Sequence, residues 1–434
     1  MSELSAQLAA ALPENSGVRP GWLKDLRESG AEQFRMHGLP TRKDEAWKYT
    51  GLAALDEAGV QLATPSELPL SGGSHPAPLA ESALHLWMLD GQILEQAGAM
   101  PDGVTVLPLK TALIEGINGL QALLESLSGR HPKGKSGDGF SALNSATLDS
   151  GVVIHVAAGM DGGRMSLAWS SSQAGQPLLF NSRVCLILEP GARLELLEQF
   201  EGPDDNANTG NIIVQVQLDK DAVLQHIRFQ QESEKAALIT RTEVLQKTRS
   251  EYAYYGFDLG GGLIRHDLHA SLLGKDAKSS INGAYLLDGR RHVDNHSRVD
   301  HFATGGTSDQ YFRGVAGGSG RAVFNTAVCV HPGADETEAT QSNANILLSK
   351  RAEVDTKPEL EIYADEVIAS HGATVGQLDE LAVFYLRSRG LTEKAARHLL
   401  TTAFCQSVSD RLPDSHLGEL ISQRMMEVMP HAED

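Results

Sequence analysis

The most restrictive feature of this sequence is a long central stretch, from about residue 145 to 375, of short strand-like segments separated by turns. These segments alternate polar and apolar residues or run apolar with β-branched side chains, and no helical pattern comes between them. Examples are GVVIHVAAG, RVCLILEPG, NIIVQVQLD, AVLQHIRFQ and RAVFNTAVCVHPG. About 230 residues of this kind exceed a simple β-sandwich, whereas a solenoid extends easily because each coil contacts only its neighbours. The pattern therefore predicts a mainly β protein built on a parallel β-helix.

A small turn motif recurs along the same stretch. Successive copies are roughly 30, 55 and 57 residues apart, and each copy separates two predicted strands. The period is loose, but a turn repeated between strands is typical of stacked coils. The copies are Pro190-Gly191-Ala192, Lys220-Asp221-Ala222, Lys275-Asp276-Ala277 and Pro332-Gly333-Ala334.

Composition and periodicity divide the chain into four parts. In the N-terminal part, residues 1–130, two short strands are predicted between about 84 and 109, and a helix with an apolar stripe is predicted over 112–127. A segment rich in Gly, Lys and Ser follows this helix and predicts a linker. The predicted parts are a mainly helical N-terminal domain (1–130), the linker (131–144), a parallel β-helix core (145–376) and a helical C-terminal domain (377–434).

The charge balance and the absence of targeting signals narrow the function. Lys plus Arg number 37 against 56 Asp plus Glu, which gives a net charge of −19 and disfavours nucleic acid and anionic membranes as partners. The N-terminus has no basic n-region, and no stretch reaches about 18 uninterrupted apolar residues, so neither a signal peptide nor a membrane span is expected. Cys185, Cys329 and Cys405 are far apart, which indicates buried free thiols in a reducing compartment. A soluble cytoplasmic protein is expected.

The stretch from Lys357 to Gly390 carries the most informative motif. Its apolar residues predict a strand that leads to His371 among small residues, and beyond Gly376 the apolar residues follow a helical period. The run KPELEIYADEVIASHGATVG resembles a recurring signature of the SufB/SufD family of iron–sulfur cluster assembly proteins. GLPTRKDEAWKYT near the N-terminus and DHFATGGTSDQYFRG in the core resemble further runs of that family. The aromatic and basic residues of GLPTRKDEAWKYT alone would indicate a half-exposed packing surface. The resemblance implies a right-handed β-helix core.

Two positions indicate which kind of family member this chain resembles. In SufB-type proteins a cysteine lies in the segment that matches residues 342–345, and a glutamate follows the histidine. This chain has Ala344 and Gly372 in those places, so it lacks the thiolate and carboxylate but keeps the histidine, as SufD-type members do. Some of those members also carry a cysteine two residues before the histidine, where this chain has Ala369.

The resemblance implies a non-enzymatic scaffold subunit in a complex with SufB and the ATPase SufC. His371, flanked by Ser370 and Gly372, is then expected to face the SufB cysteine where the two β-helix ends meet, as a helper iron ligand or as a base. No cofactor is expected to be held stably; a transient iron–sulfur cluster is shared with SufB, and reduced flavin is a further candidate in the complex. Whether the chain forms homodimers stays open. The residues expected to dock SufC are Leu378, Leu381, Tyr385, Leu386, Leu399 and Phe404.

Two other function classes match parts of the sequence. Residues 129–136 satisfy G-x-x-x-x-G-K-[ST], the phosphate-binding loop of nucleotide hydrolases, with Lys135 and Ser136 in the key places. A helix rather than a buried strand precedes this segment, and Pro132 removes an amide, so a chance match in a linker is favoured. A β-helix carbohydrate enzyme fits the fold, but such enzymes need clustered carboxylates in a groove and are usually exported.

Six histidines lie between residues 266 and 331. Two pairs, three and four residues apart, could bind metal on a helix, but this region is predicted to be strand, where residues four apart share a face and residues three apart do not. The neighbouring acids Asp267, Asp294, Asp300 and Asp309 fit surface turns of a solenoid equally well. Structural or solvent-facing roles are therefore favoured. The six are His266, His269, His292, His296, His301 and His331.

Overall fold

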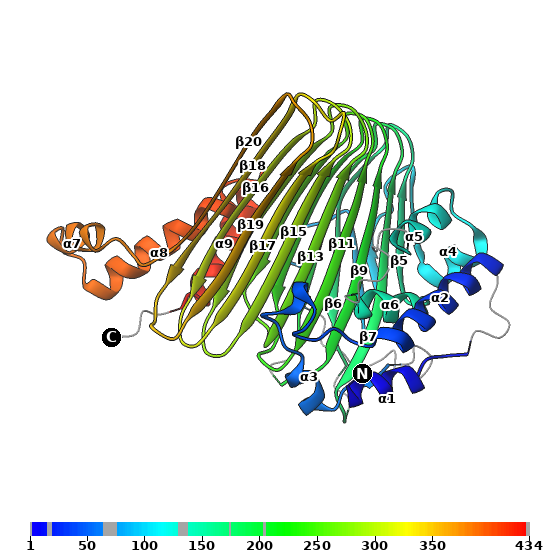
Figure 1. Cartoon of the computed structure of the whole chain (residues 1–434), viewed down its shortest axis with the longest axis horizontal. Coiled ribbons are helices and arrows are strands. Elements are labelled where there is room, and N and C mark those ends of the chain that lie inside the picture. Colours follow the sequence, from blue (N-terminus) through cyan, green and yellow to red (C-terminus); the bar gives the residue numbers. More distant parts are fainter. Residues whose placement is uncertain are drawn as a thin grey trace.

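The protein is a two-sheet parallel β-solenoid of about 7 turns with helices at both ends (Figure 1). Strand outweighs helix, 44% to 24%, so the predicted mainly β class is confirmed. The phosphate-loop-like segment 129–136 lies outside the described residues. The computed structural model describes residues 2–14, 20–63, 76–128, 138–172, 175–202 and 205–430.

The chain alternates between two sheets, because each coil contributes one strand to each. Sheet A has the order β19-β17-β15-β13-β11-β9-β7-β5-β4, with β1 beside β7, and sheet B has the order β20-β18-β16-β14-β12-β10-β8-β6-β2-β3. The strands of sheet A are β1 (Gln61–Leu62), β4 (Val104–Pro108), β5 (Gly151–Val156), β7 (Leu178–Leu188), β9 (Thr209–Leu218), β11 (Ala237–Gln246), β13 (Leu263–Leu272), β15 (His292–His301), β17 (Arg321–Val330) and β19 (Glu353–Ile362). Those of sheet B are β2 (Leu84–Leu89), β3 (Gln92–Gly98), β6 (Asp161–Ser170), β8 (Arg193–Glu201), β10 (Val223–Gln231), β12 (Glu251–Asp258), β14 (Lys278–Leu287), β16 (Thr307–Ala316), β18 (Thr337–Leu347) and β20 (Val367–Gly376).

The loosely spaced turn motif becomes a regular ladder in the structure. Arg249 and Gly305 occupy two further turns that lack the sequence motif, and they share a positive φ with Asp221 and Asp276. Asp221, Arg249 and Asp276 each donate their amide to a carbonyl of the next turn, at 2.9–3.0 Å. The coil therefore repeats about every 30 residues, and the longer intervals in the sequence span two coils each.

Inward-facing side chains of both sheets fill the solenoid. Strand alternation sends every second residue inside, and the in-register parallel pairing stacks these residues coil upon coil. Leu186, Val216, Leu224, Ile264 and Val299 are fully buried in this way, each contributing about 1.5–3 kcal/mol by leaving water. The core thus runs the length of the solenoid.

The N-terminal helices cover one end of the solenoid (Figure 1). The helix predicted over 112–127 is instead two helices, because Gly116 and Gly119 adopt φ of 79° and 81° and interrupt it. The predicted short strands are confirmed as β2, which belongs to sheet B, and β4, which belongs to sheet A. The helical elements are α1 (Glu3–Ala10), α2 (Gly21–His37), the 3-10 helix η1 (Glu45–Trp47), α3 (Ala53–Ala58), α4 (Leu109–Glu115), α5 (Leu120–Ser128) and α6 (Gly139–Ala146).

The end of the predicted linker 131–144 is ordered. Helix α6 starts at Gly139, and the Asp138 side chain caps it by accepting a hydrogen bond from the Ser141 amide at 2.9 Å. The helix packs closely on α2, where a Cβ at Gly30 would lie 2.8 Å from the Ala142 carbonyl oxygen. A linker is therefore the wrong description for residues 138–144.

Residues 41–50, which we call the strap, lie against the outer face of sheet A. Trp47 is buried against Phe140, with ring centroids 5.6 Å apart, and lies under the Arg265 guanidinium at 4.0 Å. Thr50 donates to Asp294 at 2.5 Å. The predicted half-exposed packing surface is therefore wrong for Trp47, which is an anchor with 3% of its surface exposed.

Three helices complete the chain: α7 (Glu380–Ser388), α8 (Glu393–Ser409) and α9 (Ser415–Glu427). Thr392 caps α8 as an acceptor for the Ala395 amide at 3.2 Å. Arg411, in the segment after α8, donates hydrogen bonds to two residues of sheet B, Asn282 at 2.6 Å and Asp309 at 2.7 Å. Helix α7 extends away from the solenoid (Figure 1). Across the described ranges, no helix has the length and apolarity to cross a membrane.

Candidate functional site

The solenoid ends in two strands that have a partner on one side only. In the part of the chain that the structure describes, β19 pairs with β17 alone and β20 with β18 alone. The KPELEI motif, predicted as one strand leading to His371, is split between them: Leu360 and Ile362 belong to β19, whereas His371 lies in the middle of β20. The signature motif therefore contributes to both strands of the terminal coil.

The open end carries large apolar side chains in contact with solvent. A row of unpaired amides and carbonyls beside exposed apolar residues is a template for another β-structure, which natural proteins usually cover. This end is therefore the surface of the solenoid most suited to receive a partner. The exposed residues are Ile362 (44%), Tyr363 (61%), Ile368 (72%) and Val375 (42%).

His371 occupies an inward position of the open coil. It pairs in register with Gln341 of β18, which in turn pairs with Gln310 of β16. Gln310 and Gln341 are buried inside the solenoid, whereas His371 is exposed because no further coil covers it. The imidazole thus lies on the exposed cross-section of the solenoid, where a docking coil would cover it.

A buried polar network lies directly behind this cross-section. Asn345 accepts a hydrogen bond from Tyr285 at 2.5 Å and donates to Asn343 at 2.6 Å and to the Thr374 carbonyl of β20 at 3.1 Å. Thr356 of β19 donates to Asn343 at 3.1 Å. Burial raises the pKa of Tyr285, so it stays a neutral donor. The network ties both terminal strands to the coils beneath and stiffens the edge that holds His371.

Ser370 and Gly372 alternate with His371 and lie on the outer side of β20, both exposed. A Cβ at Gly372 would meet no atom within 4 Å. Packing therefore does not exclude a larger residue at this position. Ala344 lies one coil deeper, paired with Thr374.

The six residues predicted to dock SufC fall into two groups. Leu378, Leu386 and Phe404 pack into the apolar cluster that joins the C-terminal helices to sheet B. Leu381, Tyr385 and Leu399 are exposed on α7 and α8, and Phe384, which the sequence reading did not select, joins them at 68% exposure. We call these four residues the tail patch.

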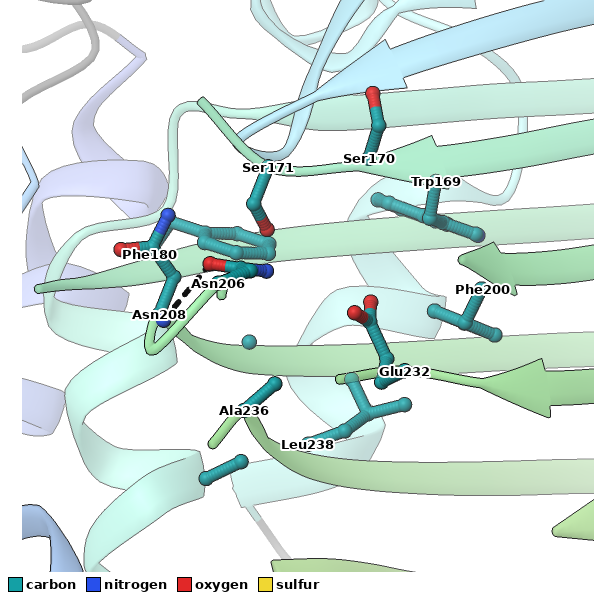
Figure 2. A pocket seen from close by; sticks show the side chains of 12 residues that line it. Trp169, Ser170, Ser171, Phe180, Phe200, Asn206, Asn208, Glu232, Ala236 and Leu238 are labelled. Atoms are coloured by element: carbon teal, nitrogen blue, oxygen red, sulfur yellow. Dashed lines mark hydrogen bonds between the residues drawn. The ribbon is translucent and has the colours of Figure 1, made fainter. Parts of the chain in front are cut away.

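A small pocket lies where strands of both sheets turn, between Trp169, Phe180, Phe200, Asn206 and Glu232 (Figure 2). Glu232 points its carboxylate into this pocket (Figure 2). Burial raises the pKa of Glu232 to about 7, and its Oε2 atom has no hydrogen-bond partner. The pocket has room for about one water molecule, so it is too small for a flavin or a nucleotide.

The structure assembles one polar cluster that sequence spacing did not reveal. Asp300, Cys329 and His331 place one ligand-type atom each within 4.8 Å of one another on the outer face of sheet A. His269 of the neighbouring coil contacts Asp300 at 2.5 Å, whereas His266 and His301 are buried inside the solenoid. The sequence pointed to His269 and His331 among six weighed histidines, but the coil length of about 30 residues was too loosely defined to place them beside Asp300 and Cys329.

Sequence comparison shows which known proteins this chain is similar to. The family described as SUF system FeS cluster assembly, SufBD core domain, matches residues 170–404. The chain is 28% identical over 439 residues to the iron–sulfur cluster assembly protein SufD of Escherichia coli, covering 97% of this chain and 99% of that protein. It is also 28% identical over 420 residues to an iron–sulfur cluster assembly SufBD family protein of Synechocystis, covering 94% and 91%. A third relative is Protein ABCI7, chloroplastic, of Arabidopsis thaliana, 28% identical over 432 residues and covering 95% and 88%. The chain therefore belongs to the SufBD family of SUF-system iron–sulfur cluster assembly proteins.

Proposed function

We propose that this chain is a SufD-type, non-catalytic scaffold subunit that works in the cytoplasm beside SufB and the ATPase SufC. The observation that carries the proposal is the position of His371 on an open solenoid end. An uncovered cross-section, with exposed Tyr363 beside it and exposed Ile368 on the outer side of β20, suits a second β-solenoid, whose own end would pair with β19 and β20. The imidazole is then enclosed at the junction of the two proteins.

In that junction His371 acts on a cysteine of SufB. A neutral imidazole can ligate iron, or it can accept the thiol proton and leave the thiolate that binds iron. Iron and sulfide are the cargo of this site, and the cluster is shared only until it is passed on. Reduced flavin in the complex would bind elsewhere than the Glu232 pocket, which is too small for it.

The first experiment tests His371 in the assembled complex. His371→Ala is co-purified with SufB and SufC and loaded anaerobically with iron and sulfide, and His416→Ala, an exposed histidine at the start of α9, is the matched control. We expect the same complex with His371→Ala but less cluster absorbance, and normal loading with His416→Ala. Equal loading of both variants would refute the role of His371.

The second experiment tests the open end as the junction. Ile368→Lys places a charge on the exposed edge without disturbing the core, because Ile368 is 72% exposed. Ile114→Lys, at the other end of the molecule and 74% exposed, is its control. We expect Ile368→Lys to lose SufB in a pull-down while Ile114→Lys retains it. Retention of SufB by both variants would place the junction elsewhere.

The tail patch is proposed to bind SufC. Four exposed apolar residues on two adjoining helices form an anchor surface for a partner. We expect the double variant Leu381→Asp/Phe384→Asp to lose SufC but to keep SufB. Ile114→Asp, at the exposed position used as a control above, should keep both. SufC bound as tightly as to wild type would leave α7 as a solenoid cap only.

A further inference from the structure

The outer face of sheet A brings three different metal-ligand types together. Asp300 of β15 pairs in register with Cys329 of β17, so the two side chains stand side by side on the same face. His331 follows Cys329 by two residues, and its Nε2 lies 3.0 Å from Asp300 Oδ1. One oxygen, one sulfur and one nitrogen thus lie within 4.8 Å of one another.

The side chains are held in place before any ligand binds. The His331 ring stacks on Phe302, with centroids 4.1 Å apart and an interplanar angle of 10°. Cys329 and Asp300 are buried, at 2% and 4% exposure. His269 contacts Asp300 with Nε2 at 2.5 Å and Glu243 with Nδ1 at 3.2 Å. A histidine oriented by a carboxylate through its other nitrogen is the usual support around a metal site.

We propose that Asp300, Cys329 and His331 bind one divalent transition-metal ion of borderline softness, such as Zn²⁺ or Fe²⁺. Thiolate, imidazole and carboxylate together suit such ions, whereas Mg²⁺ and Ca²⁺ prefer oxygen alone. Ligand atoms around a tetrahedral ion lie about 3.5 Å apart at these bond lengths, and the three atoms here all lie within 4.8 Å of one another. His269 contacts Asp300 but is not among the three clustered ligand residues, so a water molecule would take the fourth position. The inference does not depend on the proposed junction with SufB, which involves β19, β20 and His371.

Two features of the cluster oppose metal binding. Arg298 donates to both oxygens of Asp300 at 2.8 Å and competes with a cation for that carboxylate. Burial, with smaller contributions from Asp300 and Glu361, raises the pKa of the Cys329 thiol to about 11. Binding must therefore release the thiol proton to solvent as the metal–sulfur bond forms, and the affinity should rise with pH.

The experiment is a titration of the full-length, metal-stripped chain with Co²⁺ under reducing, anaerobic conditions. We expect a thiolate-to-cobalt charge-transfer band with a stoichiometry of one, and its displacement by Zn²⁺ or by anaerobic Fe²⁺. Arg298→Gln should tighten Co²⁺ binding, because the competing cation is gone from Asp300. A band that neither Zn²⁺ nor Fe²⁺ displaces would overturn the proposed class of ion.

Variants separate this cluster from the other thiols. Cys329→Ser should abolish the band, and His331→Ala, at a half-buried position, should weaken binding by about 10-fold or more. Cys185→Ser and Cys405→Ser, in buried positions elsewhere, are the matched controls and should keep the band. Unfolding curves of each variant confirm that it is folded. No band in wild type, or a band that survives in Cys329→Ser, would overturn the proposal.

Discussion

Arg265 connects the strap to sheet A through hydrogen bonds and ion pairs. Replacing Arg265 with methionine tests how the strap is held against the sheet. The Arg265 side chain, 2% exposed, donates to Asp294 at 2.5 Å, to the Ala46 carbonyl at 2.7 Å and to Asp267 at 2.8 Å. It also covers the Trp47 ring. Methionine keeps much of the apolar stem but removes the charge and all donors.

The expected cost follows from the carboxylates left behind. Breaking a buried ion pair from one side costs about 3–5 kcal/mol, because the remaining charge stays buried without its partner. The lost cation–π contact with Trp47 adds about 1 kcal/mol. We therefore expect Arg265→Met to lower the free energy of unfolding by about 4 kcal/mol at pH 7, of which double replacement with Asp294→Asn should recover at least half.

The loss should depend on pH in a defined direction. Burial would raise the pKa of Asp294, but Arg265 outweighs this and holds the pKa below its usual range in wild type. That contribution to stability is present above about pH 3.9 and is lost as the pH falls. Without Arg265, burial dominates and the carboxyl can take up a proton, so the difference between wild type and variant should shrink from pH 7 to pH 5.

Urea denaturation followed by tryptophan fluorescence measures the change, and hydrogen exchange of residues 41–50 shows whether the strap is released first. Arg249→Met is the matched control, because Arg249 makes a similar two-point contact with Asp221 at 2.7 and 2.8 Å on the surface. It should unfold like wild type, since solvent screens that pair. Equal midpoints for the two variants, or no coupling to Asp294→Asn, would refute the reasoning.

Three further predictions concern the solenoid interior and its turns. Burial lowers the pKa of His301 to about 4, so the stability that its neutral form provides above pH 6.5 is lost as the pH falls. His301→Gln should therefore reduce the loss of unfolding free energy between pH 7 and pH 5 by about 2 kcal/mol. Urea denaturation curves with the same pH dependence as wild type would contradict this. The pKa of Glu232 is raised to about 7, so its charge destabilises the folded protein above about pH 4.5. Glu232→Gln should therefore raise the free energy of unfolding by about 1–3 kcal/mol at pH 8 and hardly at pH 4. An equal stabilisation at both pH values would indicate a packing effect instead. Gly191 adopts φ 73° in its turn, so Gly191→Ala should lower the free energy of unfolding by about 1–2 kcal/mol, measured by thermal unfolding. Gly372→Ala should be neutral, because the space around Gly372 is open. Similar losses in both variants would show that turn geometry is not the cause.

Local patterns in the sequence determined the elements and the class of fold. Strand alternation and turn residues act over a few positions, so they predicted stacked strands and the helical tail. The single strand predicted to lead to His371 is instead two strands, and His371 lies in the middle of the second. Glycine interruptions such as Gly116 and Gly119 were overlooked because an apolar stripe continues across them. The regular coil was missed because its turns tolerate Arg249 as well as glycine and aspartate.

Only the tertiary structure decided which distant residues meet. Residues about one coil apart become neighbours through in-register pairing, and a change of one residue in coil length would move Cys329 away from Asp300 and to the opposite face. The same holds for the strap, whose Trp47 finds Arg265 across more than 200 positions of sequence. Periodicity is a property of neighbouring residues, whereas these contacts depend on the summed lengths of strands and turns, which no single segment encodes.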